Sequence, residues 1–373
     1  MIKVLFNVRP DYLSNPGGDT IQIQKTAEAL RGLNIKVKTS PRLDDDLTDY
    51  NIVHLFNLGR VMETYLQCQN ARKQNKPIAL STIYWNMDEY NTKGIDSLIL
   101  KAFHIFIKNE KLKLQIHRIK YLFCRKKLSL IDKTRLKIGY KDQQRFVIQN
   151  SDVLLPNSEM EMEVIRKDFS LNKKYKVAVN AVDKKFYYAS PEVFLENYGK
   201  YGLINNNFIL CVSRIEDRKN ILNFIKAVND IGIKTIIIGK SSPSQKNYYI
   251  KCKNIANQNI VFLDHIAHDD LPSAYAAAKV HVLPSWYETP GLSSLEAGLS
   301  GCNIVSTDRG STKEYFKDFA EYCNPSSIDS IKKAVIKAFH KPKDDRLKIY
   351  ILKNYTWDRT AEETLEAYKM LLH

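Results

Sequence analysis

Short apolar runs alternate with helical patterns along this chain, and they do so in two separate series. The runs of the first series are 3–8, 35–38, 52–56, 78–81 and 153–155, and those of the second are 208–212, 235–239, 260–263, 280–283 and 303–306. Such runs are typical of strands buried on both faces, and a helix between consecutive strands indicates a parallel sheet. The pattern therefore predicts two doubly wound α/β domains, which bind ligands at the carboxyl ends of their strands.

The helix predicted between the first two runs shows how the helical segments are recognised. It covers 19–33, with Asp19 and Thr20 as capping residues and apolar residues at Ile23, Ala27 and Leu30. This spacing places the apolar side chains on one face of a helix.

The predicted organisation has two domains and a final helix. A length of 373 residues suits two packed cores better than one. We expect a first domain over 1–185, a basic helical insertion within it at about 97–149, a second domain over 195–355, and a last helix over 356–373. Turn-forming and aromatic residues replace the periodicity near 180–194, where we place the linker.

The net charge of +16 is concentrated in one segment. Between Lys101 and Arg145 there are fourteen Lys or Arg and three acidic residues. A nucleic acid, an anionic membrane and an anionic substrate all fit such a charge, but no nucleic-acid reading motif accompanies it, so we do not expect nucleic acid as a partner. Phe103, Leu112 and other apolar residues lie among the cations. They fit either a surface on an anionic membrane or helices whose apolar side is domain core.

The cysteines and the N-terminus bear on the cellular compartment. The six cysteines show no CxxC pairing, which indicates reduced thiols rather than disulfides or a structural metal site. The first residues read as a strand and not as a signal peptide, and no uncharged apolar run is long enough to span a membrane. We therefore expect a cytoplasmic protein.

The segment Pro284-Ser-Trp-Tyr-Glu-Thr-Pro-Gly-Leu-Ser-Ser-Leu-Glu-Ala297 follows a predicted strand and leads into a helix. Glu288 precedes the helix, Pro290 suits its first turn, Gly291 allows a ligand near the backbone, and Glu296 lies one turn inside. Free N–H groups at a helix start suit a pyrophosphate, and carboxylates accept hydrogen bonds from sugar hydroxyls. The candidate residues of this segment are Glu288, Pro290, Gly291, Leu292, Ser293 and Glu296.

A second group of candidates follows the predicted strand 208–212. The segment Cys211-Val-Ser-Arg-Ile-Glu-Asp-Arg-Lys-Asn220 places Arg214 and Lys219 at the end of this strand. Two fixed cations can bind a diphosphate and stabilise the negative charge that develops on it when a glycosidic bond breaks. Taken alone, the same residues also fit a solvated turn.

Together these two motifs resemble the retaining glycosyltransferases of family four, the glycosyl transferases group 1. Their signature is a pair of glutamates separated by seven residues, which Glu288 and Glu296 match, and an Arg and a Lys at the places of Arg214 and Lys219. The resemblance implies that Glu288 lies by the donor sugar, that Glu296 binds the ribose, and that the cations hold the diphosphate. It also implies the GT-B architecture, two Rossmann-like domains facing a central cleft, and a last helix that crosses back to the first domain.

The same resemblance implies further donor contacts. The loop Asn15-Pro-Gly-Gly-Asp-Thr20 corresponds to the family's glycine loop, in which Gly17 and Gly18 approach the donor phosphate. By themselves these residues also fit a tight turn with positive φ. Backbone groups near His265 and Ile266 are expected to hold the nucleobase.

On the acceptor side the sequence departs from the family. Many relatives have a His-Asp pair after the strand at 78–81, and this chain has Tyr84 and Trp85 there. His54 matches a histidine at the end of the preceding strand. His54, Tyr84 and Trp85 are therefore the acceptor-side candidates.

The resemblance implies a nucleotide-sugar-dependent, retaining hexosyltransferase or related enzyme. We expect a UDP-sugar as the first donor and a GDP-sugar as the second, and a glycan or lipid-linked acceptor in cell-surface polysaccharide or glycoconjugate synthesis. The catalytic residues would be Arg214, Lys219 and Glu288, without a metal or cofactor, and Lys219→Ala should lower turnover far more than stability. An epimerase or hydrolase of the same fold, or a non-catalytic sugar-nucleotide-binding protein, stays an alternative.

Overall fold

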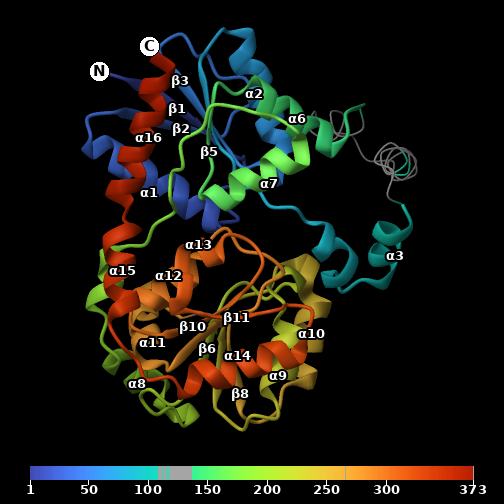
Figure 1. Ribbon diagram of the computed structural model, residues 1–373, viewed down its shortest axis with the longest axis vertical. Coiled ribbons are helices and arrows are strands. Elements are labelled where there is room, and N and C mark those ends of the chain that lie inside the picture. Colours follow the sequence, from blue (N-terminus) through green and yellow to red (C-terminus); the bar gives the residue numbers. More distant parts are fainter. Residues whose placement is uncertain (108–111, 113–115, 117–136, 265, 373) are drawn as a thin grey trace. The chain divides into compact units, whose positions relative to one another are not determined.

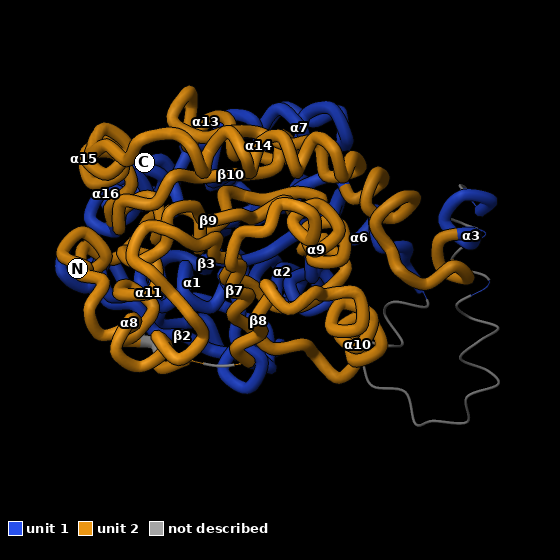
Figure 2. Tube along the Cα trace, turned by 90° about the horizontal axis from the view of Figure 1, so that it is seen from below, with its two compact units in different colours: residues 1–86, 102–180, 357–373 blue, residues 87–101, 181–356 orange. Residues whose placement is uncertain are grey.

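The computed structural model describes residues 1–107, 112, 116, 137–264 and 266–372. They form two compact units, coloured separately in Figure 2. Unit 1 contains Met1–Asn86, Ala102–Asn180 and Trp357–His373, and unit 2 contains Met87–Lys101 and Ala181–Thr356. Each unit has a parallel sheet with helices on both faces (Figure 1). The prediction of two doubly wound α/β domains is confirmed.

In the described residues, unit 1 has a five-stranded sheet in the order β2-β1-β3-β4-β5. All of its strand pairs are parallel. The five predicted strands are all present: β1 (Lys3–Asn7), β2 (Lys36–Ser40), β3 (Ile52–Phe56), β4 (Ile78–Ser81) and β5 (Val153–Leu155).

Helices cover both faces of this sheet. The helical elements are α1 (Gly18–Gly32), η1 (Leu58–Arg60), α2 (Val61–Lys73), α6 (Tyr140–Asn150), α7 (Glu159–Phe169) and α16 (Trp357–Leu372). Alternate side chains of β3 point to opposite faces, so that Val53 packs in one core cluster with residues of α2, α6 and α7. Ile52 packs in the other cluster with α1 and α16. The first and last helices of the chain lie side by side, blue and red in Figure 1.

Two helix starts of unit 1 are fixed by short polar side chains. The N–H of Gly17 donates to Oγ1 of Thr20 at 3.1 Å, at the start of α1. Oγ of Ser158 accepts from the N–H of Glu161 at 3.0 Å, at the start of α7. Such caps satisfy backbone groups that have no partner inside the helix.

In the part of the chain that the structure describes, unit 2 has a six-stranded sheet in the order β11-β10-β9-β6-β7-β8, and all of its strand pairs are parallel. The strands are β6 (Ile209–Val212), β7 (Thr235–Ile238), β8 (Ile260–Leu263), β9 (Val280–Leu283), β10 (Asn303–Thr307) and β11 (Glu321–Cys323). The sequence predicted all of these strands except β11. Three residues at a sheet edge are too few to show a period.

The helical elements of unit 2 also lie on both faces of its sheet. One face packs against α9, α10 and α14, in a core that includes Val280 and Val282 of β9. His281, between them in the strand, points to the opposite face, where α12 lies. The elements are η3 (Lys184–Tyr188), α8 (Glu192–Tyr198), η4 (Gly199–Tyr201), η5 (Asp217–Lys219), α9 (Ile221–Val228), η6 (Pro243–Gln245), α10 (Lys246–Ile255), η7 (His268–Asp270), α11 (Leu271–Ala277), α12 (Leu292–Leu299), α13 (Thr312–Phe316), η8 (Lys317–Phe319), α14 (Ile328–His340) and α15 (Arg346–Asn354).

The segment after β4 differs from the prediction. The sequence placed 87–101 in the first domain, whereas these residues belong to unit 2. They contain η2 (Tyr90–Gly94) and the start of α3 (Leu98–Phe106). Most of the predicted basic insertion lies outside the described residues. No helix in the described ranges combines the length and the apolar character that crossing a membrane requires.

Candidate active site

The strand order of unit 2 places two candidate loops next to each other. The chain adds β7 and β8 on one side of β6, and then returns to add β9, β10 and β11 on the other side. The order of the strands therefore reverses between β6 and β9, and α/β sheets bind ligands at such a reversal, outside the carboxyl ends of the strands. The loop after β6 carries Arg214 and Lys219, and the loop after β9 carries Glu288.

Lys219 and Glu288 form a buried ion pair at this place. Nζ of Lys219 lies 2.5 Å from Oε1 of Glu288, and the side chains are only 13% and 7% exposed. Burial by itself would raise the pKa of Glu288, but Lys219 and Arg218 outweigh burial and lower it. The carboxylate therefore stays charged, next to a cation in a site with little water.

The two arginines of the same loop are held differently. Arg218 donates to Glu216 at 3.2 Å, and its guanidinium lies 5.2 Å from the ring centre of Tyr287. Arg214 is exposed, and among the described residues no hydrogen bond or ion pair engages its guanidinium. Arg214 is thus the cation of this loop that is free to contact an anionic ligand.

The backbone of Glu288 is held by a glycine that follows β10. Gly310 has φ +90°, and a β-carbon there would overlap the carbonyl oxygen of Glu288 and lie 2.7 Å from its nitrogen. The next N–H, that of Ser311, donates to the Glu288 carbonyl at 2.9 Å. Gly310 was not among the predicted site residues, although the turn Asp308-Arg-Gly-Ser311 directly follows a predicted strand.

A histidine fills the gap where β6 and β9 separate. The N–H of Val212 donates to Nε2 of His281 at 3.4 Å, and Nδ1 of His281 lies 3.5 Å from Oγ of Ser294. Burial, together with the charge of Lys219, lowers the pKa of His281 to about 3. The neutral imidazole therefore accepts the N–H of Val212, where the strand pairing between β6 and β9 has ended.

Glu296 lies in α12, one turn after the helix start. Its Oε2 accepts from the hydroxyl of Tyr275 at 3.0 Å. Burial raises the pKa of Glu296 to about 7. The carboxyl group thus changes its charge near neutral pH.

The start of α12 differs in one detail from the prediction. Gly291 is the N-cap, with φ +93°, and the helix begins at Leu292. Pro290 therefore lies before the helix and not in its first turn, and its bond to Thr289 is cis. Leu292 and Ser293 are half-buried in the first turn.

The expected nucleobase contacts lie after β8. Ile266 is 4% exposed. His265 lies outside the described residues, so its role stays a prediction.

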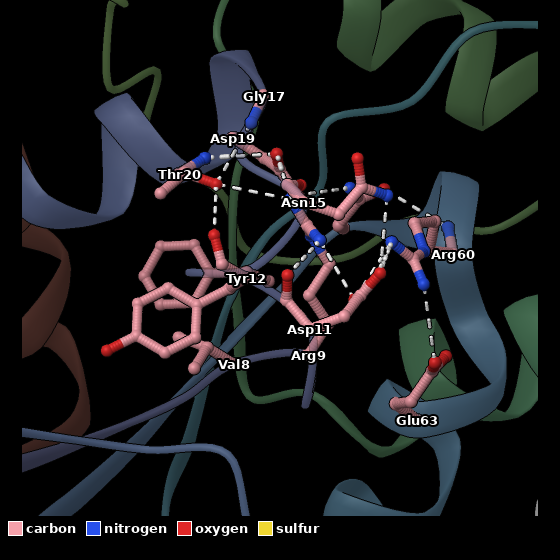
Figure 3. A network of polar contacts seen from close by, with 12 residues as sticks. Val8, Arg9, Asp11, Tyr12, Asn15, Gly17, Asp19, Thr20, Arg60 and Glu63 are labelled. Atoms are coloured by element: carbon pink, nitrogen blue, oxygen red, sulfur yellow. Dashed lines mark hydrogen bonds and ion pairs between the residues drawn. The ribbon is translucent and has the colours of Figure 1, made fainter. Parts of the chain in front are cut away.

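In unit 1 a polar network lies at the corresponding reversal of strand order, between β1 and β3 (Figure 3). Arg9 is 8% exposed and donates to Asp19 at 2.8 Å, to Asp11 at 2.8 Å and to the carbonyl of Asn15 at 2.7 Å. Nη1 of Arg60 lies 3.1 Å from the Asp11 carboxylate. Although burial acts in the other direction, Arg9 and Arg60 lower the pKa of Asp11 to about 2.

This network was not predicted from the sequence. The sequence feature that could have indicated it is the segment Arg-Pro-Asp directly after the first strand, which contains the oppositely charged Arg9 and Asp11. Carboxylates and guanidinium groups in fixed positions can bind sugar hydroxyls, which both donate and accept hydrogen bonds.

The glycine loop ends at the same network. Gly17 is the N-cap of α1, with φ −146°. Neither Gly17 nor Gly18 has a positive φ, so the interpretation as a tight turn that requires one is wrong. Gly17 already donates its N–H to Thr20, whereas Gly18 is exposed at the first position of α1.

His54 does not reach the edge of the sheet. It is fully buried, its Nδ1 lies 2.7 Å from the hydroxyl of Tyr368, and its Nε2 lies 2.9 Å from Oγ of Ser81. Burial lowers its pKa to about 3. Both ring nitrogens are occupied inside the core, which contradicts the assignment of His54 to the acceptor side.

Tyr84 and Trp85 follow β4, as the sequence places them. Tyr84 is 6% exposed, and its hydroxyl donates to Asp168 at 2.7 Å. The N–H of Tyr84 donates to Glu161 at 2.8 Å. Tyr84 is therefore directed into α7, while Trp85 is half-buried and stays the acceptor-side candidate after β4.

Comparison with known proteins connects the second unit with one family. Residues 198–353 match the model of glycosyl transferases group 1. O-antigen chain mannosyltransferase B of Escherichia coli is 26% identical over 196 residues, which are 49% of this chain and 51% of that protein. An uncharacterized glycosyltransferase of Methanocaldococcus jannaschii is 29% identical over 184 residues, 45% of this chain and 46% of that protein. The chain thus spans about half the length of these two curated relatives.

Solved structures share the fold of the whole chain. Sucrose-phosphate synthase from Thermosynechococcus elongatus has a TM-score of 0.74 and 15% identity, over 100% of this chain and 99% of that one. HepE from Anabaena, solved in complex with UDP and glucose, has a TM-score of 0.67 and 14% identity, over 100% of both chains. At these identities the likeness shows the fold alone, and the predicted GT-B architecture is confirmed. The region matched to the group 1 glycosyl transferases contains Arg214, Lys219 and Glu288.

Proposed function

We propose that this protein is a retaining glycosyltransferase of family four that moves a sugar from a nucleotide sugar to a glycan or lipid-linked acceptor. The observation that carries the proposal is the buried pair of Lys219 and Glu288 at the reversal of strand order in unit 2. A cation and a carboxylate in one desolvated place suit the two parts of a donor, the charged diphosphate and the sugar hydroxyls. Lys219 contacts the diphosphate and Glu288 the sugar hydroxyls, while the two side chains stay paired.

The proposed chemistry is front-face displacement. The bond between the anomeric carbon and the diphosphate oxygen breaks, and a bond to the acceptor oxygen forms on the same face of the sugar. The proton of the acceptor hydroxyl goes to the leaving diphosphate. Arg214, Lys219 and the N–H groups at the start of α12 stabilise the charge on that diphosphate, so this mechanism uses no metal.

Glu296 binds the nucleoside in this proposal. Its carboxyl group, half-buried in α12 and bonded to Tyr275, accepts from the ribose hydroxyls. The contacts of Gly18 with the donor phosphate and of the backbone near Ile266 with the nucleobase stay predictions.

The donor we propose first is a UDP-sugar, and a GDP-sugar is the second. The complex of HepE with UDP and glucose supports the first. The name of the Escherichia coli relative, O-antigen chain mannosyltransferase B, supports a glycan acceptor. We assign the acceptor to the edge of unit 1 that carries Arg9, Asp11 and Arg60, instead of to His54.

A thermal-shift screen tests the donor site. The parent protein and Glu296→Ala are heated with UDP, GDP, ADP and CDP and with their sugar conjugates. A ligand at a hundred times its Kd adds about 2.7 kcal/mol to stability, so one nucleotide should raise the Tm of the parent and raise that of the variant much less. If no nucleotide raises the Tm of the parent, the proposed function fails. Turnover of the nucleotide sugar without an acceptor would indicate an epimerase or hydrolase instead.

We also propose that the enzyme acts in the cytoplasm, at an anionic membrane surface. In helix α3 the side chains of Leu98, Ile99 and Phe106 are 81%, 83% and 82% exposed. The basic sequence between Lys101 and Arg145 begins within this helix. Exposed apolar side chains beside cations are typical of helices that lie in the interface of an anionic bilayer.

A vesicle-binding assay tests the membrane proposal. We expect the parent to co-sediment with vesicles of anionic phospholipid at low salt and to be released at high salt. The triple variant Leu98→Ser, Ile99→Ser, Phe106→Ser should bind much less. The matched control, Ile204→Ser, changes an apolar side chain that is 65% exposed in unit 2. Equal binding of parent and triple variant contradicts a role of α3.

A further inference from the structure

One segment of unit 2 comes from the middle of the sequence of unit 1. Residues 87–101, named the strap from here on, have the colour of unit 2 in Figure 2, while the residues before and after them belong to unit 1. The central turn of the strap, η2, is a π-helix. Such turns are rare and occur frequently at functional sites.

The first contact of the strap reaches the loop that carries Lys219. The hydroxyl of Tyr90 donates to Oδ1 of Asp217 at 2.7 Å, and the N–H of Asp96 donates to Oδ2 at 3.2 Å. Burial and the charge of Asp217 both raise the pKa of Tyr90, so its hydroxyl keeps its proton and remains a donor. Asp217 is 7% exposed and begins the single turn η5, which ends at Lys219.

Two more contacts reach the loops that position Glu288. Both carboxylate oxygens of Glu89 accept from Arg309, at 2.8 and 3.2 Å, and Arg309 directly precedes Gly310, which supports the backbone of Glu288. Gly94 packs on Trp286, two residues before Glu288. A β-carbon on Gly94 would lie 2.6 Å from Nε1 of this indole.

We propose that Tyr90 and Glu89 are positioning residues of the donor site. Through Asp217 and Arg309 the strap fixes the loops after β6 and β10, and thereby holds Lys219 against Glu288. Charge-stabilising groups act well only when they are fixed before the reaction. The catalytic consequence rests on the proposed function, whereas the positioning of Lys219 does not.

The positioning is tested by amine labelling, without any substrate. Lys219 is protected in the parent, because its side chain is 13% exposed and paired with Glu288. Weakening one of these half-buried contacts makes local opening about fivefold more frequent. Tyr90→Phe and Glu89→Gln should therefore each raise the labelling rate of Lys219 by about this factor, measured by peptide mass spectrometry.

The matched control is Lys251→Met. It removes an ion pair of the same strap, between Lys251 and the Asp96 carboxylate at 2.8 Å. It changes none of the groups that bond to Asp217 or Arg309, because Asp96 contacts Asp217 through its backbone N–H. This variant should label Lys219 at the rate of the parent. Equal rates in the parent, Tyr90→Phe and Glu89→Gln would overturn the proposal, whether or not the protein transfers sugar.

A double-mutant cycle tests the catalytic consequence. If Tyr90 acts through Lys219, Tyr90→Phe lowers kcat in the parent but has no further effect on the residual rate of Lys219→Met. If Tyr90→Phe lowers kcat by the same factor in the parent and in Lys219→Met, Tyr90 does not act through Lys219. A protein that no nucleotide stabilises would refute the proposed function alone, because the labelling result decides the positioning independently.

Discussion

At the scale of single residues, the two cations of the proposed donor site are held in different ways. Arg214 is exposed, whereas Lys219 is buried against Glu288. We therefore expect the loss of Lys219, but not the loss of Arg214, to lower the stability of the fold. From the sequence alone, a loss of Lys219 was expected to affect turnover much more than folding, and the ion pair changes that expectation.

Arg214→Ala should separate catalysis from stability. We expect kcat/KM to fall by roughly 10²–10³-fold, the usual cost of losing one charge-stabilising donor. The free energy of unfolding should stay within about 0.5 kcal/mol of the parent value, as for most surface substitutions. Steady-state kinetics and urea unfolding check both, with Lys226→Ala as an exposed cation on α9 that should change neither. A normal rate in Arg214→Ala contradicts its assignment.

Lys219→Met should lower the rate by a similar factor, and it should also cost about 3–5 kcal/mol of stability, because it leaves a buried carboxylate without its main partner. Urea unfolding of Lys219→Met and of the double variant Lys219→Met, Glu288→Leu checks this. The double variant should recover part of the lost stability, since the unpaired charge is gone. If Lys219→Met is as stable as the parent, the ion pair contributes nothing to the fold.

Glu296 makes stability depend on pH. Its pKa of about 7 in the fold is raised from an ordinary 4.5, so the folded state binds the proton more tightly than the unfolded chain. Its charge therefore opposes folding, increasingly as the pH rises from 4.5 to 7 and fully above 7. Glu296→Gln should be more stable than the parent at pH 8, by an amount on the order of 3 kcal/mol, and equally stable at pH 4.5. Thermal unfolding at both pH values checks this. A stability difference between Glu296→Gln and the parent that is equal at pH 4.5 and pH 8 would contradict it.

At the scale of elements, the glycine after β10 lets the backbone of the loop after β9 approach closely. Gly310→Ala would force a β-carbon into the backbone of Glu288, at φ +90°. Gly301→Ala is a matched control, because Gly301 has φ +86° but no atom within 4 Å of the added carbon. The control should lose about 1–2 kcal/mol for its backbone conformation. Gly310→Ala should lose more and should also lose activity, as unfolding curves and kinetics would show; equal losses would contradict a role for the close approach.

At the scale of the whole molecule, the last helix completes the core of the unit that begins the chain. Ala361, Ala367 and Tyr368 of α16 pack in the same cluster as strands β1 and β3. The hydroxyl of Tyr368 is also a partner of the buried His54. Unit 1 is thus formed by segments from both ends of the chain.

Tyr368→Phe should therefore destabilise unit 1. It leaves Nδ1 of a buried imidazole without a partner, which costs about 1–3 kcal/mol. Calorimetry should show a lower transition temperature for unit 1, while binding of a nucleoside diphosphate by unit 2 is retained. Met370→Ala, at a residue of the same helix that is 42% exposed, should change little. A shift of equal size in Met370→Ala would indicate that the helix, and not this hydrogen bond, is responsible.

The sequence by itself determined the two series of strands, the first helix and the residue types of the donor motifs. The strands of these sheets are buried on both faces, so each appears as an apolar run that can be read locally. Arg214, Lys219, Glu288 and Glu296 lie in short motifs directly after strands, so their side of the sheet follows from the chain direction.

Only the tertiary structure decided which of these residues meet. Lys219 and Glu288 are 69 positions apart, and they form a pair because β6 and β9 are neighbours in the sheet. Gly310 and Glu288, Asp11 and Arg60, and the strap and Asp217 are likewise far apart in the sequence and meet only in the folded chain. His54 shows the opposite case, since the register of β3 and the return of α16 bury a histidine that its sequence position had suggested for the acceptor side. Contacts between distant segments depend on strand order and packing, and local periodicity carries no information about either.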